Sequence, residues 1–310
     1  MHEHIARTMY YFSVHLLFAS MVACAAWVLT SIRNASATTK YWVWVVTAFN
    51  FLVPLGALID KFWTRHLVWA APLGFIGGPV WDMTQGRTAL VVALIWMTGA
   101  FCMLIRLISR IRKEHREDQA LAGLRANHLT SSFVAHGIPV SFGAKLPGPL
   151  VRGVFNPQIS LPGGIERLLN KRELNAVLLH ELTHARRRDN FIRLLYELSL
   201  CALWFNPLVW LAGMRMALYR ELSCDESVIR REHGQALVSA LAKLAAPEQA
   251  PFLQATASSH LSYRLALLGK PLPATNRTTS LLMSSLFGIV VMVGVFGTVA
   301  HTACCFVLKH

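Results

Sequence analysis

Apolar residues collect along the chain in four stretches, each about as long as a membrane-spanning helix. A helix rises 1.5 Å per residue, so about 20 apolar residues cross the ~30 Å hydrocarbon core of a bilayer. This pattern predicts a membrane domain with three spans over residues 1–109, and a segment 280–310 with a fourth span and a short tail. The predicted spans cover about residues 9–31, 41–59, 88–108 and 280–300.

The segment between the third and fourth spans, residues 110–279, has the mixed pattern of an α+β domain. Charged helix formers over 111–129 predict that the third helix continues beyond the membrane. Short apolar patches separated by glycine and proline over 131–161 predict a small antiparallel sheet. Pro157 favours an edge strand within 151–161, because proline cannot donate a hydrogen bond to a neighbouring strand. The predicted fold is a mainly α integral membrane protein with an α+β domain inserted before its last span.

Residues 170–190 predict an amphipathic helix within this domain. Asn170 is a good N-cap, and Glu173 follows three residues later, as in a capping box. Further along, residues 191–216 are apolar but are interrupted at Asn206-Pro207, and proline breaks the interior of a helix. We therefore predict a helical hairpin that lies against the membrane or dips into it, rather than a fifth span. In the helix predicted over residues 170–190, apolar residues recur at helical spacing, at Leu174, Val177, Leu178, Leu182 and Ala185.

The amphipathic helix carries His180, Glu181 and His184 in an H-E-x-x-H arrangement. Residues four apart share a helix face, so both imidazoles can point at one Zn²⁺ ion, with Glu181 as a general base towards water. The alternative is a chance motif on a solvated helix face. A catalytic zinc site usually has three protein ligands and an open position, so a third ligand must come from another element.

Glu221 is the best candidate for the third ligand, and Asp225 shares its helix face four residues later. One carboxylate can bind the metal while the other accepts the free ring N–H of a ligand histidine. Asp189 is a second candidate for that supporting role, or an ordinary helix cap. The alternatives are a solvated face in which Arg220 pairs with these carboxylates, or Cys224 as the ligand.

Composition and charge narrow the class of protein. A hydrophobic content of 54% with only 15% charged residues excludes an ordinary soluble domain. The net charge of +14 could indicate nucleic-acid binding, but no basic strip with interleaved aromatics supports it, and attraction to anionic lipid explains the excess. The six cysteines have no spacing typical of disulfide frameworks or Cys-type zinc sites. Basic residues crowd the end of the third span, from Arg106 to Arg116, which places residues 110–279 in the cytoplasm.

Three segments together resemble the BlaR/MecR-type membrane metallopeptidases, a branch of the gluzincin zinc peptidases. The resemblance implies that His180, His184 and Glu221 bind one zinc ion per chain. It also implies that Glu181 is the catalytic base and that Asp225 orients a ligand. The segments are HELTHARRRD (180–189), WFNPLVW (204–210) and RELSCDESV (220–228).

The resemblance further implies a zinc endopeptidase of the bacterial cytoplasmic membrane that cleaves a cytoplasmic or membrane-proximal protein, such as a transcriptional repressor. In gluzincins an edge strand pairs with the extended substrate, which points to an edge strand near Val154, Phe155 and Asn156. The alternative is an ordinary edge strand that ends at Pro162-Gly163-Gly164. HtpX-type and prenyl-protease-like quality-control proteases are the first alternative, but they usually have Ala-Asp where this chain has Cys224-Asp225. A non-catalytic receptor on a peptidase scaffold is the second, although no predicted ligand or base is missing.

Receptors of this type carry a penicillin-binding sensor domain after the last span. The sequence stops at His310, about ten residues past the fourth predicted span, so we expect no sensor domain at this end. The Ser-x-x-Lys motif of penicillin-binding nucleophiles does not occur in the sequence. We therefore expect a stimulus to arrive through a separate sensor partner, the outer loop 60–87 or the lipid bilayer.

Overall fold

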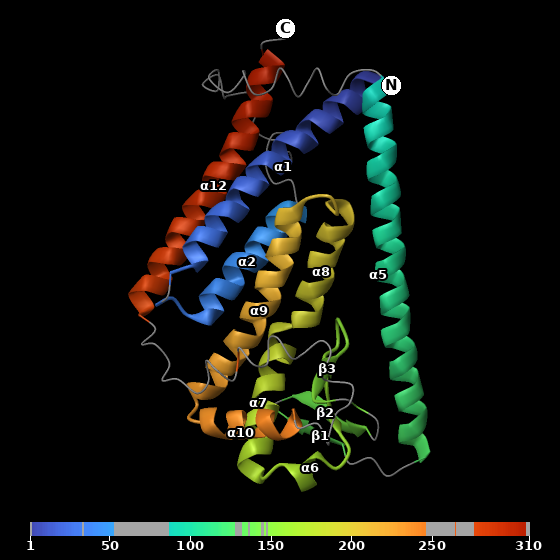
Figure 1. Cartoon of the computed structure of the whole chain (residues 1–310), viewed down its shortest axis with the longest axis vertical. Helices are drawn as coiled ribbons and strands as arrows, with labels where there is room; N and C mark the ends of the chain where they lie inside the picture. The colour runs from blue at the N-terminus through green and yellow to red at the C-terminus, as the bar shows by residue number, and fades with distance from the viewer. Residues whose placement is uncertain are drawn as a thin grey trace.

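The computed structural model describes residues 2–32, 34–52, 87–127, 132–135, 137–143, 146, 148–245, 264 and 276–307. This part of the chain is mainly helical with one small sheet, and the sheet lies at the opposite end of the molecule from both termini (Figure 1). The helices that overlap the four predicted spans are α1 (His2–Thr30), α2 (Ala37–Leu52), α5 (Arg87–Asn127) and α12 (Arg277–Val307). The other helices are α6 (Ile165–Leu168), α7 (Lys171–Arg187), α8 (Asp189–Ala202), α9 (Pro207–Ile229) and α10 (Gly234–Leu244).

Three of the described helices are long and apolar enough to cross a membrane. These segments are Phe12–Thr30 in α1, Leu90–Arg116 in α5 and Arg277–Gly297 in α12, and they correspond to the first, third and fourth predicted spans. Helix α5 runs on to Asn127, which confirms that the third helix continues beyond its span. Helix α2 holds the first part of the predicted second span, 41–59. The rest of that span, and the predicted outer loop as far as residue 86, lie outside the described residues, so the count of four spans stays a prediction.

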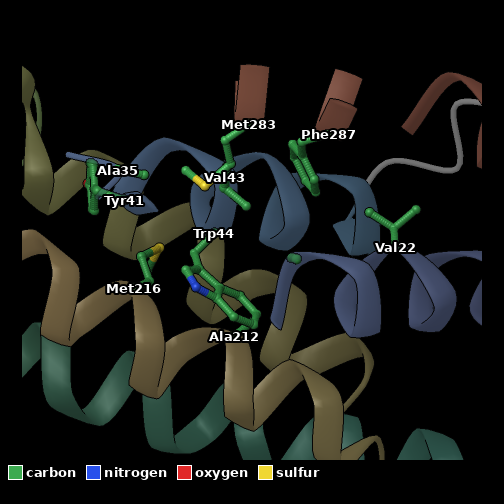
Figure 2. Close-up of a cluster of buried hydrophobic side chains, with 10 residues drawn as sticks. Val22, Ala35, Tyr41, Val43, Trp44, Ala212, Met216, Met283 and Phe287 are labelled. Carbon is green, nitrogen blue, oxygen red and sulfur yellow. The ribbon is translucent and has the colours of Figure 1, made fainter. Parts of the chain in front are cut away.

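Helix α2 is enclosed in a core that it shares with three other helices (Figure 2). Trp44 and Tyr41 of α2 are almost completely buried. Close van der Waals packing of this kind is what holds helices together within a bilayer, so these contacts anchor α2 to its neighbours. Their partners include Val22 of α1, Ala212 and Met216 of α9, and Met283 and Phe287 of α12.

The predicted break at Asn206-Pro207 is present, and it joins α8 and α9 into a helical hairpin. Asn206 is the N-cap of α9 and Pro207 its first residue, a position where the missing N–H of proline costs nothing. The side-chain amide of Asn206 donates to Ser20 Oγ of α1 at 3.3 Å. Ser20 lies ten residues before the end of α1, about 15 Å at 1.5 Å per residue, which is half of a ~30 Å hydrocarbon core. The tip of the hairpin is therefore level with the middle of the first span.

Helix α5 contacts the same hairpin tip from another side. Trp96 of α5 donates its indole N–H to Ala202 O at 2.7 Å, and Trp204 donates to Trp96 O at 3.3 Å. Gly99 permits this approach, because a Cβ at this position would lie 2.1 Å from the Trp204 ring. The tip is thus fixed between two of the candidate membrane helices.

The sheet contains strands β1 (Ser132–Ala135), β2 (Ile138–Gly143), β3 (Leu150–Arg152) and β4 (Gln158–Pro162), in the order β1-β2-β4-β3. The prediction of a purely antiparallel sheet is wrong in one respect, because β2 and β4 are parallel. Strand β3 lies two places away from β2 in the sheet, and β4 fills the place between them. Because β4 is antiparallel to β3, it runs in the same direction as β2. The buried face of this sheet packs against α7 and α10.

Helix α7 begins where its sequence predicts. The Asn170 side chain accepts from the N–H groups of Arg172 and Glu173, while Glu173 accepts from Asn170 N at 2.9 Å, so the capping box is complete. Val177, Leu182 and Ala185 are buried against the sheet core. This packing turns a different face of α7, with both histidines, towards α9.

Candidate metal centre

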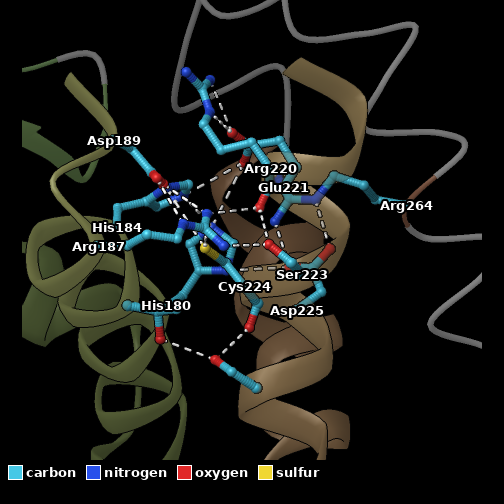
Figure 3. Close-up of polar contacts among 12 residues, drawn as sticks. His180, His184, Arg187, Asp189, Arg220, Glu221, Ser223, Cys224, Asp225 and Arg264 are labelled. Atoms are coloured by element: carbon cyan, nitrogen blue, oxygen red, sulfur yellow. Dashed lines mark hydrogen bonds and ion pairs between the residues drawn. The ribbon is translucent and has the colours of Figure 1, made fainter. Parts of the chain in front are cut away.

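Helices α7 and α9 bring His180, His184 and Glu221 together in the part of the chain that the structure describes (Figure 3). The two imidazoles face each other through Nε2 atoms 3.2 Å apart. Glu221 Oε2 lies 3.6 Å from Nε2 of His180 and 3.8 Å from Nε2 of His184. Tetrahedral zinc with ligand bonds of 2.0–2.1 Å separates its ligand atoms by about 3.3–3.5 Å. The three side chains therefore fit one zinc ion with little adjustment.

Each imidazole has a carboxylate next to its Nδ1 atom, on the side that faces away from the other imidazole. His184 Nδ1 lies 2.6 Å from Asp189 Oδ2, and His180 Nδ1 lies 3.1 Å from Asp225 Oδ1. The second pair is close but is not aligned for a hydrogen bond. Carboxylates in this position hold the proton on Nδ1 and leave Nε2 free for a metal. The structure thus gives Asp225 and Asp189 the contacts expected of supporting groups.

The electrostatics of this site favour a cation. Burial lowers the pKa of His180, but Asp225 and Glu221 beside the ring raise it more, to about 9. His184 has the same balance, in which burial lowers its pKa and its negatively charged neighbours raise it well above the ordinary value. Burial raises the pKa of Glu221, and the two histidines outweigh this effect and hold it well below the ordinary range. The carboxylates stay ionised, which is what a divalent cation requires.

Glu181, the predicted general base, follows His180 directly in α7. Its side chain is buried, and it forms neither a hydrogen bond nor an ion pair with any residue that the structure describes. A general base must lie within hydrogen-bond reach of the proton that it takes, and Glu181 is next to a candidate ligand in the sequence. Its catalytic role stays a prediction.

The sequence pointed to Arg220 as an ion-pair partner, and Arg220 does bond Glu221 Oε1 at 3.0 Å, but two further cations of the network were not predicted. Arg264 donates two hydrogen bonds to Asp225, at 2.8 and 2.7 Å, and lies 3.4 Å from Glu221. Arg187 bonds both oxygens of Asp189 at 2.6 Å and is largely enclosed by its neighbours. No local pattern marks Arg264, because its partners lie far away in the sequence.

A second group of possible ligands, His184, Asp189 and Cys224, also lies within 4.8 Å. The Arg187 guanidinium contacts two of its members, Asp189 at 2.6 Å and the Cys224 sulfur at 3.2 Å. A fixed positive charge in this place opposes a metal ion. Cys224 is therefore a weaker candidate for a zinc ligand than Glu221.

The predicted substrate-binding strand requires a correction. Val154, Phe155 and Asn156 are not in a strand but in the turn between β3 and β4, and the Phe155 ring packs near Phe191. Strand β3, directly before the turn, is one of the two edge strands of the described sheet, and Pro157 precedes β4. The carbonyls of Val151 and Gly153 already accept from the Asn190 amide at 3.0 and 3.2 Å. An extended substrate would compete with this amide at the edge of β3.

Comparison with known proteins matches these observations. Over 154 residues, 46% of this chain and 26% of the relative, the sequence is 28% identical to the methicillin resistance mecR1 proteins of Staphylococcus aureus and Staphylococcus epidermidis. Over 144 residues it is 30% identical to the regulatory protein BlaR1 of Bacillus licheniformis, with 44% of this chain and 24% of that protein covered. The matched part thus spans about a quarter of the length of these relatives. The family model described as BlaR1 peptidase M56 matches residues 78–268, more than half of the chain, and the protein therefore belongs to this peptidase family.

Proposed function

We propose that this chain is a membrane-bound zinc endopeptidase in which His180, His184 and Glu221 hold one Zn²⁺ ion. The observation that carries the proposal is the set of separations between the three ligand atoms, 3.2, 3.6 and 3.8 Å. Oε1 of Glu221 accepts from Arg220, whereas Oε2 is the oxygen near both imidazole Nε2 atoms and also lies 3.4 Å from Arg264 Nη1. The supporting aspartates and the family membership agree with this assignment.

A zinc ion held by these three side chains would supply a Lewis acid for the scissile carbonyl and the attacking water. Glu181 is the group that would take a proton from water as general base and return it to the leaving amine. Asp225 and Asp189 keep the histidine rings oriented throughout. The two side chains before Glu221 in the sequence already form hydrogen bonds. Arg220 donates to Glu221, and Tyr219 donates to Thr30 O at 3.3 Å.

The depth of the site supports a substrate cleaved at the membrane surface. The Tyr219 hydroxyl, two residues before Glu221, donates to the carbonyl of Thr30, the last residue of the first candidate span. The metal centre would thus lie close to the membrane surface at that end of the span. Cleavage of a membrane-proximal segment suits this position.

The basic residues at the end of α5 support a peptidase domain that faces the cytoplasm of a bacterial cell. The printed names of the relatives concern methicillin resistance and regulation. We propose by analogy that the substrate is a cytoplasmic regulator, such as a transcriptional repressor, in an antibiotic-response pathway. A separate sensor partner would supply the stimulus.

The test compares cells that produce the wild-type protein with cells that produce Glu181→Gln. Glutamine keeps the shape of the side chain but cannot accept the proton, so proteolysis should stop while the purified protein still holds one zinc ion. Glu166→Gln, an exposed glutamate on α6, is the matched control and should leave both unchanged. The readouts are zinc content and cleaved proteins identified by mass spectrometry. Proteolysis that continues in Glu181→Gln would refute the assignment of the base.

A further inference from the structure

Tyr41 connects helix α2 to the candidate metal centre. Its side chain is 1% exposed, and its hydroxyl donates to Asp189 Oδ1 at 2.9 Å. The other oxygen of Asp189 is the one that lies 2.6 Å from His184 Nδ1. A chain of two hydrogen bonds therefore joins α2 to a side chain proposed to bind zinc, although Tyr41 lies far from the peptidase motif in sequence.

The orientation of Asp189 depends on these bonds. A cavity of about 220 Å³ between α2, α8 and α9 borders Tyr41 and Asp189, so close packing does not hold the carboxylate from that side. Arg187 bonds both oxygens, and its guanidinium also stacks on the Tyr41 ring, 4.1 Å from the ring centre. The phenol thus restrains the carboxylate directly through its hydroxyl and indirectly through the arginine.

We propose that Tyr41 is a positioning residue for the metal centre, which acts on His184 through Asp189. The proposal rests on the proposed function in one respect, namely that His184 binds zinc. It adds that the affinity for the metal depends on the placement of α2, a helix outside the motif and in the shared core with α1 and α12. A displacement of α2 would then alter the metal centre.

The test is zinc affinity of the purified full chain in detergent, measured by competition with a chromophoric chelator. Tyr41→Phe removes the hydroxyl and keeps the ring, its packing and the stacked arginine. Loss of a group that orients a metal ligand costs 10–100-fold in affinity. Tyr41 acts one bond further away, so we expect a loss of about 3–10-fold. Tyr196→Phe is the matched control, because Tyr196 borders the same cavity, and it should leave the affinity unchanged.

A double-mutant cycle separates positioning from a general loss of structure. Asp189→Ala removes the carboxylate that links the two side chains, so Tyr41→Phe should have no further effect on zinc affinity in that background. The absorption spectrum of the Co²⁺-substituted protein should change in Tyr41→Phe and stay as in wild type in Tyr196→Phe.

Equal zinc affinity in wild type and Tyr41→Phe would overturn the proposal, as would equal losses in both tyrosine variants or additive effects in the cycle. If the wild-type protein itself bound no stoichiometric zinc, the proposed function would fail instead. The two failures are thus distinguishable.

Discussion

Replacement of Asp225 by alanine tests the charge network behind the metal ligands. Asp225 lies 3.1 Å from His180 Nδ1 and accepts both arms of the Arg264 guanidinium, at 2.7 and 2.8 Å. The two side chains are buried, with exposed fractions of 3% for Asp225 and 11% for Arg264. Removal of the carboxylate should therefore affect zinc affinity and folding separately.

The effect on zinc follows from the lost partner of His180. Loss of such a group lowers metal affinity by about 10–100-fold, which corresponds to about 1.4–2.7 kcal/mol. The effect on folding follows from Arg264, which is left as a buried charge without this partner. Breaking a buried ion pair on one side costs about 3–5 kcal/mol in the free energy of unfolding.

The double variant Asp225→Ala/Arg264→Met distinguishes the two effects. Replacement of both members of a buried pair by apolar groups is often neutral for stability, so most of the lost unfolding free energy should return. Zinc affinity should return at most in part, because His180 lacks its carboxylate in both variants. Part of it can return because Arg264 also lies 3.4 Å from Glu221, and its removal takes a competing charge away from the ion.

The assays are denaturant unfolding of the metal-free protein in detergent and chelator competition for zinc. Glu114→Ala is the control, since its ion pair with Arg110 is exposed and such pairs contribute roughly 0–1 kcal/mol. The reasoning would be refuted by a double variant as unstable as Asp225→Ala, or by wild-type zinc affinity in Asp225→Ala.

Three further predictions concern the ligand, pH and topology. Glu221→Ala should lose stoichiometric zinc, measured by metal analysis, and wild-type affinity would exclude it as third ligand. Hydrogen bonds from Lys243, Ser239 and the Asn170 amide lower the pKa of Glu173 from 4.5 to about 2. The stabilisation that its carboxylate gives to the fold is therefore complete above pH 4.5 and is lost as the pH falls through 2. Glu173→Gln should therefore lower the thermal unfolding midpoint at neutral pH, by the equivalent of roughly 1.5–3 kcal/mol for hydrogen bonds to a charged group, and the difference from wild type should vanish between pH 4.5 and 2. In a chain without native cysteines, a cysteine at Glu166 should resist a membrane-impermeant thiol reagent in intact cells, and ready labelling would place the peptidase domain outside.

Several features could be predicted from the sequence because they depend on neighbouring residues. The capping box of Asn170 and Glu173 starts α7, and Asn206 and Pro207 start α9 after α8 has ended at Ala202. The four-residue spacing of His180 and His184 places both rings on one face of α7. Periodicity, capping and the stereochemistry of proline act within one or two helical turns, so a single sequence reveals them.

Errors arose where strand boundaries depended on the rest of the sheet. Val154 to Asn156 are apolar or amide residues that suit a strand equally well as a turn, and the pairing of β3 with β4 makes them a turn. The parallel pair of β2 and β4 was also unpredicted, because the crossover depends on how non-adjacent strands meet. Short apolar runs do not specify their partners.

Local sequence patterns were enough to predict the helix that carries the H-E-x-x-H motif, the three long apolar helices and the position of the hairpin break. The groups that surround the candidate ligands became known from the folded chain alone. Arg264 reaches Asp225, and Tyr41 reaches Asp189, from segments far from α7 along the chain. Burial of these two carboxylates is favourable because a donor or a cation lies beside each in space, and sequence distance sets no limit on which residue supplies it.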